Sequence, residues 1–229
     1  MSGLPDRPIR TFGRRNARKL SARQQALVDE RLPELAVPEA PAGTLAPESL
    51  FGSGVKEVWL EIGFGSGEHF VAQARANRDV GLIGCEPFID GMAKALVRID
   101  EAGLANVRLH MGDARDLTGW LEAASLDRVF ILFPDPWPKA RHFKRRLIQP
   151  DFLDELHRVT RPGGEVRFAT DVRSYADWAI THFLEHGGFE WTAADAQDWR
   201  HPPADHVTTR YESKKLGDIA PVWLQFSRA

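Results

Sequence analysis

The chain has 229 residues, of which 43% are apolar and 27% are charged, so it holds enough apolar material for a sizeable core. A formal net charge of -2 excludes a protein that attracts polyanions through its overall charge alone. Positive charge is instead concentrated near the N-terminus, in Arg7, Arg10, Arg14, Arg15, Arg18, Lys19 and Arg23, with no acid between residues 7 and 23. We interpret residues 1–23 as a basic arm.

The composition also bears on the cellular compartment in which the protein is expected. The single cysteine, Cys85, excludes an internal disulfide and suits a reducing environment. No apolar run follows the basic N-terminus to form a signal peptide, and the longest apolar run, residues 129–133, is too short to span a membrane. We therefore expect a cytoplasmic protein.

The first predicted element is a helix over residues 21–32 with Ser21 as its N-cap, followed by a proline- and glycine-rich linker over 33–54. From residue 55 onward, strands and helices alternate. Strands are predicted at 56–63, 80–86, 106–113, 126–133 and 165–171, helices at 68–77, 90–103, 149–160 and 174–188, a turn at 161–164, and two final strands at 189–194 and 222–228. The alternation predicts an α/β fold over residues 55–229, a mostly parallel seven-stranded sheet with helices on both faces.

A glycine-rich stretch, EIGFGSG, ends the first strand and opens a helix; its glycines are Gly63, Gly65 and Gly67. Such a loop alone is weak support for a nucleotide site, because plain turns and dinucleotide sites share it. Three acids at successive strand ends, Glu61, Glu86 and Asp113, are more specific. Glu61 favours an ammonium over a pyrophosphate, Glu86 suits a ribose diol and Asp113 suits an adenine amino group. Together they favour S-adenosylmethionine over NAD; the alternative is that Glu86 and Asp113 are solvated acids.

The most unusual stretch is FPDPWPKARHFKRR, which follows the fourth predicted strand. It holds Asp135 between two prolines, where little ordering is needed to fix the carboxylate. Trp137 offers a flat surface on which a base can stack. Six basic residues follow and suit phosphate contacts: Lys139, Arg141, His142, Lys144, Arg145 and Arg146. We interpret the stretch as a base pocket with a phosphate-binding segment; a solvated charged loop is the alternative.

Four stretches together, EIGFGSG, FPDPWPKARHFKRR, FATDVRSYADW and TRYESKKLG, resemble the bacterial tRNA (guanine-N7-)-methyltransferases from about residue 55 to the C-terminus. The resemblance implies a Rossmann-like class I methyltransferase that uses S-adenosylmethionine to methylate N7 of guanosine 46 in the tRNA variable loop. Pro138 departs from the family pattern, in which a polar residue is common.

The resemblance also implies site residues. The expected cofactor contacts are Glu61, Gly63, Gly65, Gly67, Glu86, Asp113, Ala114 and Asp135, and Asp135 is also the expected catalytic residue. The expected substrate contacts are Lys139, Asp171, Thr209, Arg210, Tyr211 and Glu212, and the expected RNA-interacting residues are Arg141, His142, Lys144, Arg145 and Arg146. From the residues alone, TRYESKKLG is equally typical of a solvated charged turn.

The expected mechanism is alignment, because guanine N7 has an in-plane lone pair and no proton to lose; Asp135 would orient the base and offset its growing charge. Three alternatives remain: another RNA methyltransferase on this fold, a dinucleotide-dependent oxidoreductase and a non-catalytic RNA-binding module. His182 and His186 have metal-ligand spacing but no acid or cysteine beside them, so no metal is expected. No membrane or obligate protein partner is expected.

Overall fold

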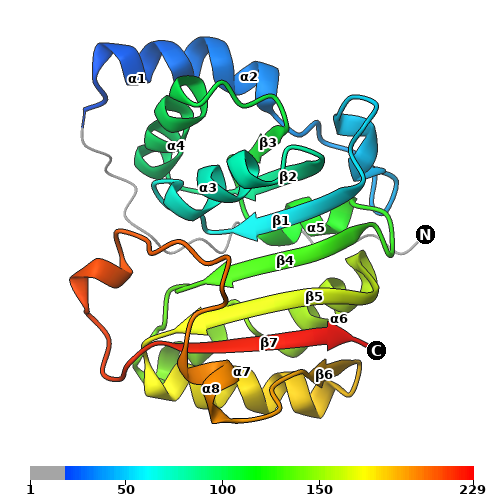
Figure 1. The fold of residues 1–229 in the computed structure, drawn as a ribbon, viewed down its shortest axis with the longest axis vertical. Helices are drawn as coiled ribbons and strands as arrows, with labels where there is room; N and C mark the ends of the chain where they lie inside the picture. Colours follow the sequence, from blue (N-terminus) through cyan, green and yellow to red (C-terminus); the bar gives the residue numbers. More distant parts are fainter. Residues whose placement is uncertain (1–18) are drawn as a thin grey trace.

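The computed structural model describes residues 19–229, so most of the predicted basic arm lies outside the described residues. Within residues 19–229, seven strands form one sheet in the order β3-β2-β1-β4-β5-β7-β6 (Figure 1). The strands are β1 (Glu57–Ile62), β2 (Val80–Cys85), β3 (Val107–His110), β4 (Leu126–Leu132), β5 (Thr160–Thr170), β6 (Phe189–Trp191) and β7 (Val222–Arg228). Strands β1 to β5 pair in parallel, whereas β7 is antiparallel to both β5 and β6. The predicted fold class is confirmed.

Helices pack on both faces of the sheet and enclose two apolar cores. The helices of the main domain are α3 (Glu68–Ala76), α4 (Ile89–Glu101), α5 (Ala114–Trp120), α6 (Pro150–Val159), α7 (Arg173–His186) and α8 (Ala196–Arg200). One core joins α5, α6 and α7 to the sheet through Leu117, Leu153 and Phe183. The other joins α3 and α4 to the opposite face through Phe70 and Leu96. All six residues of β2 are buried, as expected for a strand covered on both faces.

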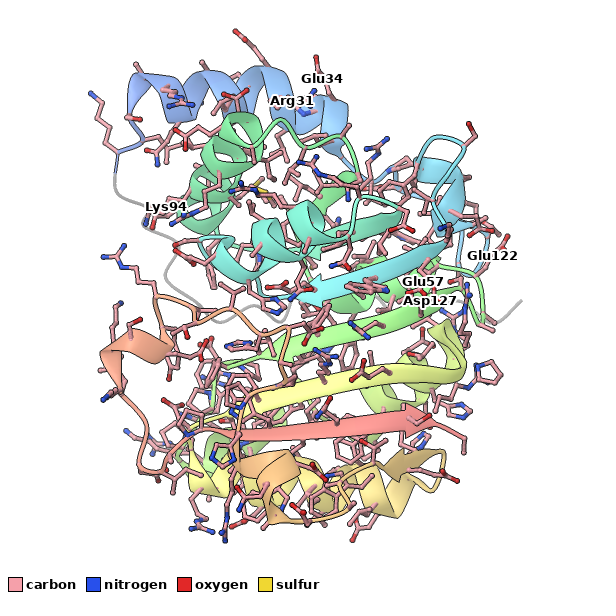
Figure 2. All side chains as sticks on the ribbon, in the orientation of Figure 1. Arg31, Glu34, Glu57, Lys94, Glu122 and Asp127 are labelled. Carbon is pink, nitrogen blue, oxygen red and sulfur yellow. The ribbon has the colours of Figure 1, made fainter. Side chains whose placement is uncertain are left out.

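The N-terminal helical segment consists of α1 (Ala22–Ala26), a π-helical turn η1 (Leu27–Arg31) and α2 (Leu32–Leu35). Ser21 caps it through a reciprocal pair of hydrogen bonds with Gln24, which confirms the predicted start. Arg23 pairs with Asp100 and Glu101 at the end of α4. Figure 2 shows Arg31 and Glu34 on the outer side of this segment, where they form an ion pair of 2.5 Å.

The predicted linker is an integral part of the domain. Leu35 belongs to one apolar core, and Val37 and Leu45 belong to the other. The backbone N–H of Val37 donates to the carbonyl of Leu109 at 2.9 Å, which extends the sheet beside β3. A short 3₁₀ helix, η2 (Pro47–Leu50), then leads to β1. The apolar residues between the prolines, rather than the prolines themselves, decide how this segment packs.

The predicted turn at residues 161–164 lies inside β5, which begins at Thr160 and pairs with β4 on both sides of the turn. The register shifts opposite Leu126 and Arg128, and Gly163 takes a φ of +75°. An irregularity in a strand therefore has the same local sequence as a loop. The short helices α5 and α8 and the 3₁₀ helices η3 (Ala140–Arg145) and η4 (Glu212–Lys214) are additional to the predicted elements.

Residues 201–221, which we call the return segment, join α8 to β7. In Figure 1 this segment, drawn in orange to red, crosses in front of the sheet and passes the carboxyl ends of β4 and β1. The return segment contains η4 and brings residues from near the C-terminus to the edge of the sheet where parallel strands end. That edge is where sheets of this type bind ligands.

Candidate active site at the carboxyl edge of the sheet

A cavity of about 290 Å³ opens at the carboxyl ends of the central strands. It is lined by the residues that follow β1, β2, β3 and β4, namely Ile62, Gly63, Cys85, Glu86, Pro87, Phe88, Gly112, Asp113, Ala114, Arg115, Phe133, Pro134, Asp135, Trp137, Arg145 and Leu147. Six predicted site residues, from four separate stretches of sequence, therefore share one cavity: Gly63, Glu86, Asp113, Ala114, Asp135 and Arg145. Their convergence follows from the parallel order of the strands, because parallel strands end at the same edge.

The glycine loop between β1 and α3 contains two kinds of glycine. Gly63 and Gly65 have φ values of +74° and +57°, and a Cβ atom at either position would meet no atom within 4 Å. Their faces are open, so a ligand can approach the backbone there. Gly67 is different, because a Cβ atom there would lie 2.8 Å from the Cβ of Ala95 on α4. Gly67 thus allows α3 to pack closely on α4, and it does not line the cavity.

Glu86 lies just after β2 with 4% of its surface exposed. One carboxylate oxygen accepts the backbone N–H of Gly65 at 2.8 Å, and the other accepts the N–H of Phe88 at 2.9 Å. Burial raises the pKa of Glu86, these two hydrogen bonds lower it, and the nearby charge of Asp135 raises it further. A carboxylate has about four acceptor sites, so Glu86 keeps acceptor capacity for hydroxyl groups of a ligand.

Asp113 is the N-cap of α5 and accepts the backbone N–H of Arg115 at 2.9 Å. The guanidinium of Arg115 also lies 3.0 Å from the Asp113 carboxylate, and the Asp113 side chain is 7% exposed. Ala114, the first residue of α5, lines the cavity beside it. The capping geometry fixes both residues at the start of α5, where they line the cavity.

Asp135 lies at the mouth of the cavity in the loop between β4 and η3. The flanking residues Phe133 and Trp137 both have positive φ, +52° and +43°, which is a costly conformation for bulky side chains. The Phe133 N–H donates to the Ala169 carbonyl at 2.8 Å and so ties the loop to β5. Although the Asp135 residue is solvent-exposed at the mouth, the protein atoms around its carboxyl group raise its pKa by desolvation. The sequence signal of proline on both sides matches a loop held in a strained conformation.

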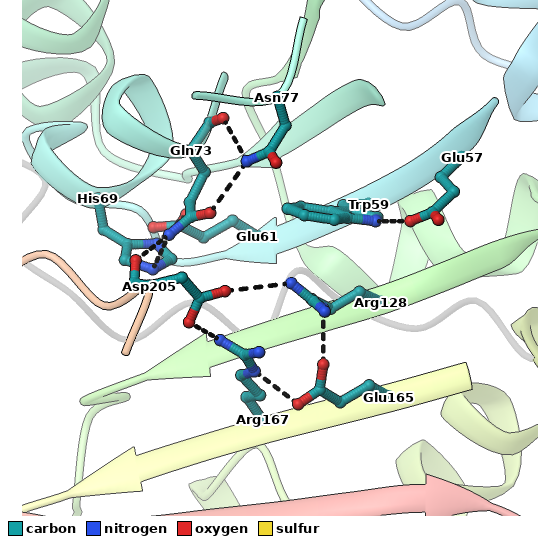
Figure 3. Close-up of polar contacts among 10 residues, drawn as sticks. All are labelled: Glu57, Trp59, Glu61, His69, Gln73, Asn77, Arg128, Glu165, Arg167 and Asp205. Atoms are coloured by element: carbon teal, nitrogen blue, oxygen red, sulfur yellow. Dashed lines mark hydrogen bonds and ion pairs between the residues drawn. The ribbon is translucent and has the colours of Figure 1, made fainter. Parts of the chain in front are cut away.

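Glu61 is placed differently from the other acids. It is 3% exposed, and its carboxylate lies 2.7 Å from Nδ1 of His69 on the first turn of α3 (Figure 3). It does not line the cavity formed by Glu86 and Asp135. The cofactor contact predicted for Glu61 stays a prediction.

The return segment reaches the cavity mouth through Tyr211. The Tyr211 hydroxyl donates to the Asp171 carboxylate at 3.3 Å, and its ring lies 5.5 Å from that of Phe133. Burial raises the pKa of Tyr211, and so do the charge of Asp171, its hydrogen bond and the charge of Asp135. Tyr211 therefore joins Asp171, another predicted substrate residue, to Phe133 in the loop that carries the predicted catalytic residue.

Thr209 and Glu212 hold each other. The Thr209 N–H donates to the Glu212 carboxylate at 2.8 Å, and the Glu212 N–H donates to the Thr209 hydroxyl at 3.3 Å. Burial would raise the pKa of Glu212, but hydrogen bonds from His206 and Thr209 outweigh burial and lower it. Arg210 is exposed between them. Glu212 therefore stabilises the fold of this turn through His206 and Thr209, a role that the sequence did not predict.

The basic segment after Asp135 folds back as η3. Lys139, Arg141 and Lys144 are exposed. The guanidinium of Arg145 lies 4.9 Å from the centre of the Trp137 ring, and His142 packs edge-on against the same ring. Desolvation and the surrounding cations lower the pKa of His142, so this residue adds no charge at neutral pH.

Arg146 is the exception in the basic segment, because it is fully buried. Its guanidinium donates to the Pro136 carbonyl at 2.9 Å and to the Ser174 carbonyl and hydroxyl at 2.8 and 2.9 Å. It also lies 3.7 Å from the centre of the Phe143 ring. A guanidinium with these partners is not available to an RNA phosphate. We therefore revise the predicted RNA contact and assign Arg146 to anchoring the loop of Asp135.

Comparison with known proteins places the chain in a family. Residues 55–223 match the family described as "Putative methyltransferase". A tRNA (guanine-N(7)-)-methyltransferase from Caulobacter sp. (strain K31) is 56% identical over 98% of this chain and 97% of its own length. A protein with the same name from Hyphomonas neptunium is 55% identical over 95% of this chain and 99% of its own.

The chain belongs to the tRNA (guanine-N(7)-)-methyltransferase family. Solved structures of more distant proteins support the fold of this family member. The 16S rRNA methyltransferase KamB has a TM-score of 0.56 at 17% identity, covering 83% of this chain and 99% of its own. A 16S rRNA (adenine(1408)-N(1))-methyltransferase from Catenulisporales acidiphilia, with its cosubstrate SAM, has a TM-score of 0.54 at 18% identity and covers 77% and 88%. The fold is that of the class I methyltransferases.

Two observations bear on other classes of site. Among residues 19–229, no group of three or more His, Cys, Asp or Glu side chains is arranged to hold a metal ion. His182 bonds the Trp178 carbonyl, while His186 contacts Asp154, so these two histidines have separate partners. In the same described range, no helix of this family member has the length and apolar character needed to cross a membrane.

Proposed function

We propose that this chain transfers a methyl group from S-adenosylmethionine to N7 of the guanosine at position 46 in the tRNA variable loop. The observation that supports this most is the Asp135 carboxylate, held between prolines at the mouth of a cavity lined by Glu86 and Asp113. Relatives at 55–56% identity named tRNA (guanine-N(7)-)-methyltransferase agree with it. A tRNA substrate suits a cytoplasmic enzyme that acts without a membrane or a metal ion.

The donor groups of the cavity fit this cofactor. Glu86 would accept the ribose hydroxyls, since each of its oxygens accepts one backbone N–H and has further lone pairs. Asp113 and Ala114 would contact the adenine. The open backbone faces of Gly63 and Gly65 would receive the methionine part. The charge of Asp135, and that of Glu61 just before the glycine loop, would offset its positive charge. When bound, the cofactor supplies an electrophilic methyl group on a sulfonium.

The substrate base would enter from the side of Trp137 and Tyr211. Asp135 would accept hydrogen bonds from guanine N1–H and the N2 amino group and so fix the direction of N7. Because N7 already has a lone pair, no proton has to be removed, and Asp135 acts by orientation and by offsetting the charge that develops on the purine. Asp171 and Tyr211 would hold the edge of the base, and Lys139, Thr209 and Arg210 would contact the adjacent nucleotide.

Exposed cations of the basic segment would hold the tRNA backbone. Lys139, Arg141 and Lys144 are exposed, and Arg145 lines the mouth of the cavity beside Trp137. Phosphate contacts of this kind position RNA without reading its sequence. The guanosine leaves its tertiary contacts to reach Asp135, which costs about a few kcal/mol, and these phosphate contacts offset that cost.

The test is one incubation of purified protein with S-adenosylmethionine and unmodified tRNA, followed by digestion to nucleosides and mass spectrometry. We expect 7-methylguanosine, its loss when guanosine 46 is replaced by adenosine, and strong reduction in the Asp135→Asn variant. A different methylated nucleoside would keep the cofactor and overturn the assigned base pocket. Absence of any methylated product, with the cofactor bound, would point to another substrate.

A further inference from the structure

Two histidines from distant parts of the chain meet behind the glycine loop. His69 is on the first turn of α3 and His206 is on the return segment, and their rings stack with centroids 5.4 Å apart. His69 is 1% exposed, and the His206 side chain is 4% exposed. Each ring also reaches a carboxylate, Glu61 for His69 and Glu212 for His206. A buried chain of contacts thus runs from Glu61 to Glu212.

The protonation of His69 follows from its neighbours. The side-chain N–H₂ of Gln73 donates to the backbone carbonyl of Asp205 at 2.7 Å, which fixes the orientation of the Gln73 amide. The same amide nitrogen lies 3.2 Å from Nε2 of His69, so its second hydrogen is donated to that ring nitrogen. His69 therefore carries its proton on Nδ1 and donates it to Glu61. Figure 3 shows the Gln73 side chain between His69 and the backbone carbonyl of Asp205, with Glu61 on the other side of the His69 contact.

His206 and Glu212, at the other end of this chain of contacts, hold the turn that contains predicted substrate residues. Nε2 of His206 lies 3.0 Å and 3.1 Å from the two oxygens of Glu212, to which it donates. Glu212 in turn closes the turn that begins at Thr209 and contains Tyr211. The centre of the His206 ring also lies 4.2 Å from the centre of the Trp223 ring on β7. His206 is therefore fixed by β7, and it fixes the turn that places Tyr211 against Phe133 in the loop of Asp135.

We propose that His69 and His206 are positioning residues that couple the two halves of the active site. In this arrangement the orientation of Glu61 at the glycine loop and the folded state of residues 206–213 depend on one another. Binding of a ligand that engages Glu61 then orders the substrate-side turn, and a folded turn favours the ligand. The proposal rests on the proposed function, in which Glu61 contacts the cofactor and residues 209–212 contact the RNA.

The first test needs no ligand and uses hydrogen exchange of the full chain. His69→Asn keeps an N–H donor for Glu61 but removes the stacking ring and, with it, the Nε2 atom that accepts from Gln73. It should speed exchange of residues 206–213 by about two- to tenfold, the effect of removing one hydrogen bond. His206→Leu should speed exchange of residues 68–73 in return. His201→Ala, an exposed histidine on the same segment, is the matched control and should change neither.

A second pair of variants separates anchoring from coupling. His206→Gln keeps the donor to Glu212 but loses the ring that stacks on His69, whereas His206→Leu loses both. With tRNA as the varied substrate, His206→Leu should raise KM, and His206→Gln should restore KM toward the value of the unaltered protein. Exchange of residues 68–73 should stay fast in both variants, because neither retains the stacked ring.

The third measurement adds S-adenosylhomocysteine, with its affinity determined by calorimetry. In the unaltered protein this ligand should slow exchange of residues 206–213, and in His69→Asn it should bind but leave those residues unprotected. The coupling would be overturned if the ligand protected residues 206–213 in both proteins. It would also be overturned if His69→Asn changed exchange only around residues 68–73 and His206→Leu only around residues 206–213. A further outcome is that S-adenosylhomocysteine fails to bind while, without ligand, each variant still speeds exchange in the other segment. In that case the proposed function would fail and the coupling would stand.

Discussion

Acids of similar chemistry lie in very different surroundings within this site. Asp135 is exposed at the cavity mouth, Glu86 is buried under two backbone N–H groups, and Glu61 is buried against His69. Burial is the largest cause of the raised pKa of both Asp135 and Glu86. These surroundings, rather than the residue types, support our proposal that Asp135 contacts the base and Glu86 the cofactor.

Asp135 is expected to contribute to the reaction far more than to cofactor affinity. Asp135→Asn keeps the shape of the side chain but removes the negative charge and one acceptor. We expect kcat to fall by about 10²–10³-fold, as for loss of one electrostatic group at a reaction centre, with S-adenosylhomocysteine affinity changed by less than about threefold. Single-turnover methylation and calorimetry measure the two quantities. Equal losses in both would contradict the assigned role.

We expect Glu86 to make cofactor affinity depend on pH. Its pKa is raised in the folded protein, so its protonated form appears at a higher pH than for an ordinary glutamate. As the pH falls through this raised pKa, Glu86 loses its charge and an acceptor, and S-adenosylhomocysteine affinity should fall. Calorimetric titrations at several pH values measure this. Glu86→Gln should bind more weakly at neutral pH and lose the pH dependence in this range; an unchanged profile would assign it to another group.

At the scale of elements, the loop from Phe133 to Arg146 depends on α7. Arg146 joins the Pro136 carbonyl to Ser174 at the start of α7, while the Tyr175 hydroxyl accepts the N–H of Leu147 at 3.1 Å. The burial of Tyr175 raises its pKa beyond its usual range, so the hydroxyl stays protonated and neutral. A strained loop needs such support, because the positive φ of Phe133 and Trp137 is maintained only by surrounding contacts.

Arg146→Ala should therefore destabilise the fold. The Pro136 and Ser174 carbonyls would lose their donor, which we expect to cost about 2–4 kcal/mol of unfolding free energy. Chemical denaturation measures this, and Arg146→Lys should give a smaller loss because it keeps a donor. Lys144→Ala is the matched control, since Lys144 is exposed: stability should change by less than about 0.5 kcal/mol, while tRNA affinity falls. If Arg146→Ala instead lowered tRNA affinity and left stability unchanged, Arg146 would be an RNA contact.

At the scale of the whole molecule, the net charge of -2 hides a local excess of cations. The basic residues between Lys139 and Arg146 follow the loop of Asp135, and Arg145 lines the cavity. Five further arginines, Arg7, Arg10, Arg14, Arg15 and Arg18, precede the first described residue. Some acids elsewhere are paired with arginines; Asp205, for example, lies between Arg128 and Arg167 (Figure 3). Unequal distribution of charge, rather than its sum, allows a weakly acidic protein to bind RNA.

Deletion of residues 1–18 should weaken tRNA binding and reduce its dependence on salt. Every phosphate that the shortened protein no longer neutralises should lower the slope of log K against log salt by about 0.7–0.9. Filter binding at several salt concentrations measures the slope, and S-adenosylhomocysteine affinity, which should be unchanged, serves as the control. An unaltered slope and affinity would exclude these residues from the RNA interface.

The succession of strands and helices, the fold class and the gathering of Glu86, Asp113 and Asp135 at one edge were predictable from the sequence. Each depends on local patterns: apolar strands that alternate with helices, and acids placed directly after strands. Relatives named tRNA (guanine-N(7)-)-methyltransferase also confirm the resemblance carried by the short motifs. Information of this kind is contained within a few neighbouring residues.

Only the tertiary structure shows which residues from distant parts of the sequence contact one another. In sequence, Arg146 is indistinguishable from Arg145, yet one is buried and the other lines the cavity. His69 and His206 are 137 positions apart in the numbering, and nothing local to either predicts that their rings stack. The same holds for residues 35–45, whose packing depends on β3. Burial and partners are set by which elements meet in space, and local sequence periodicity does not determine that.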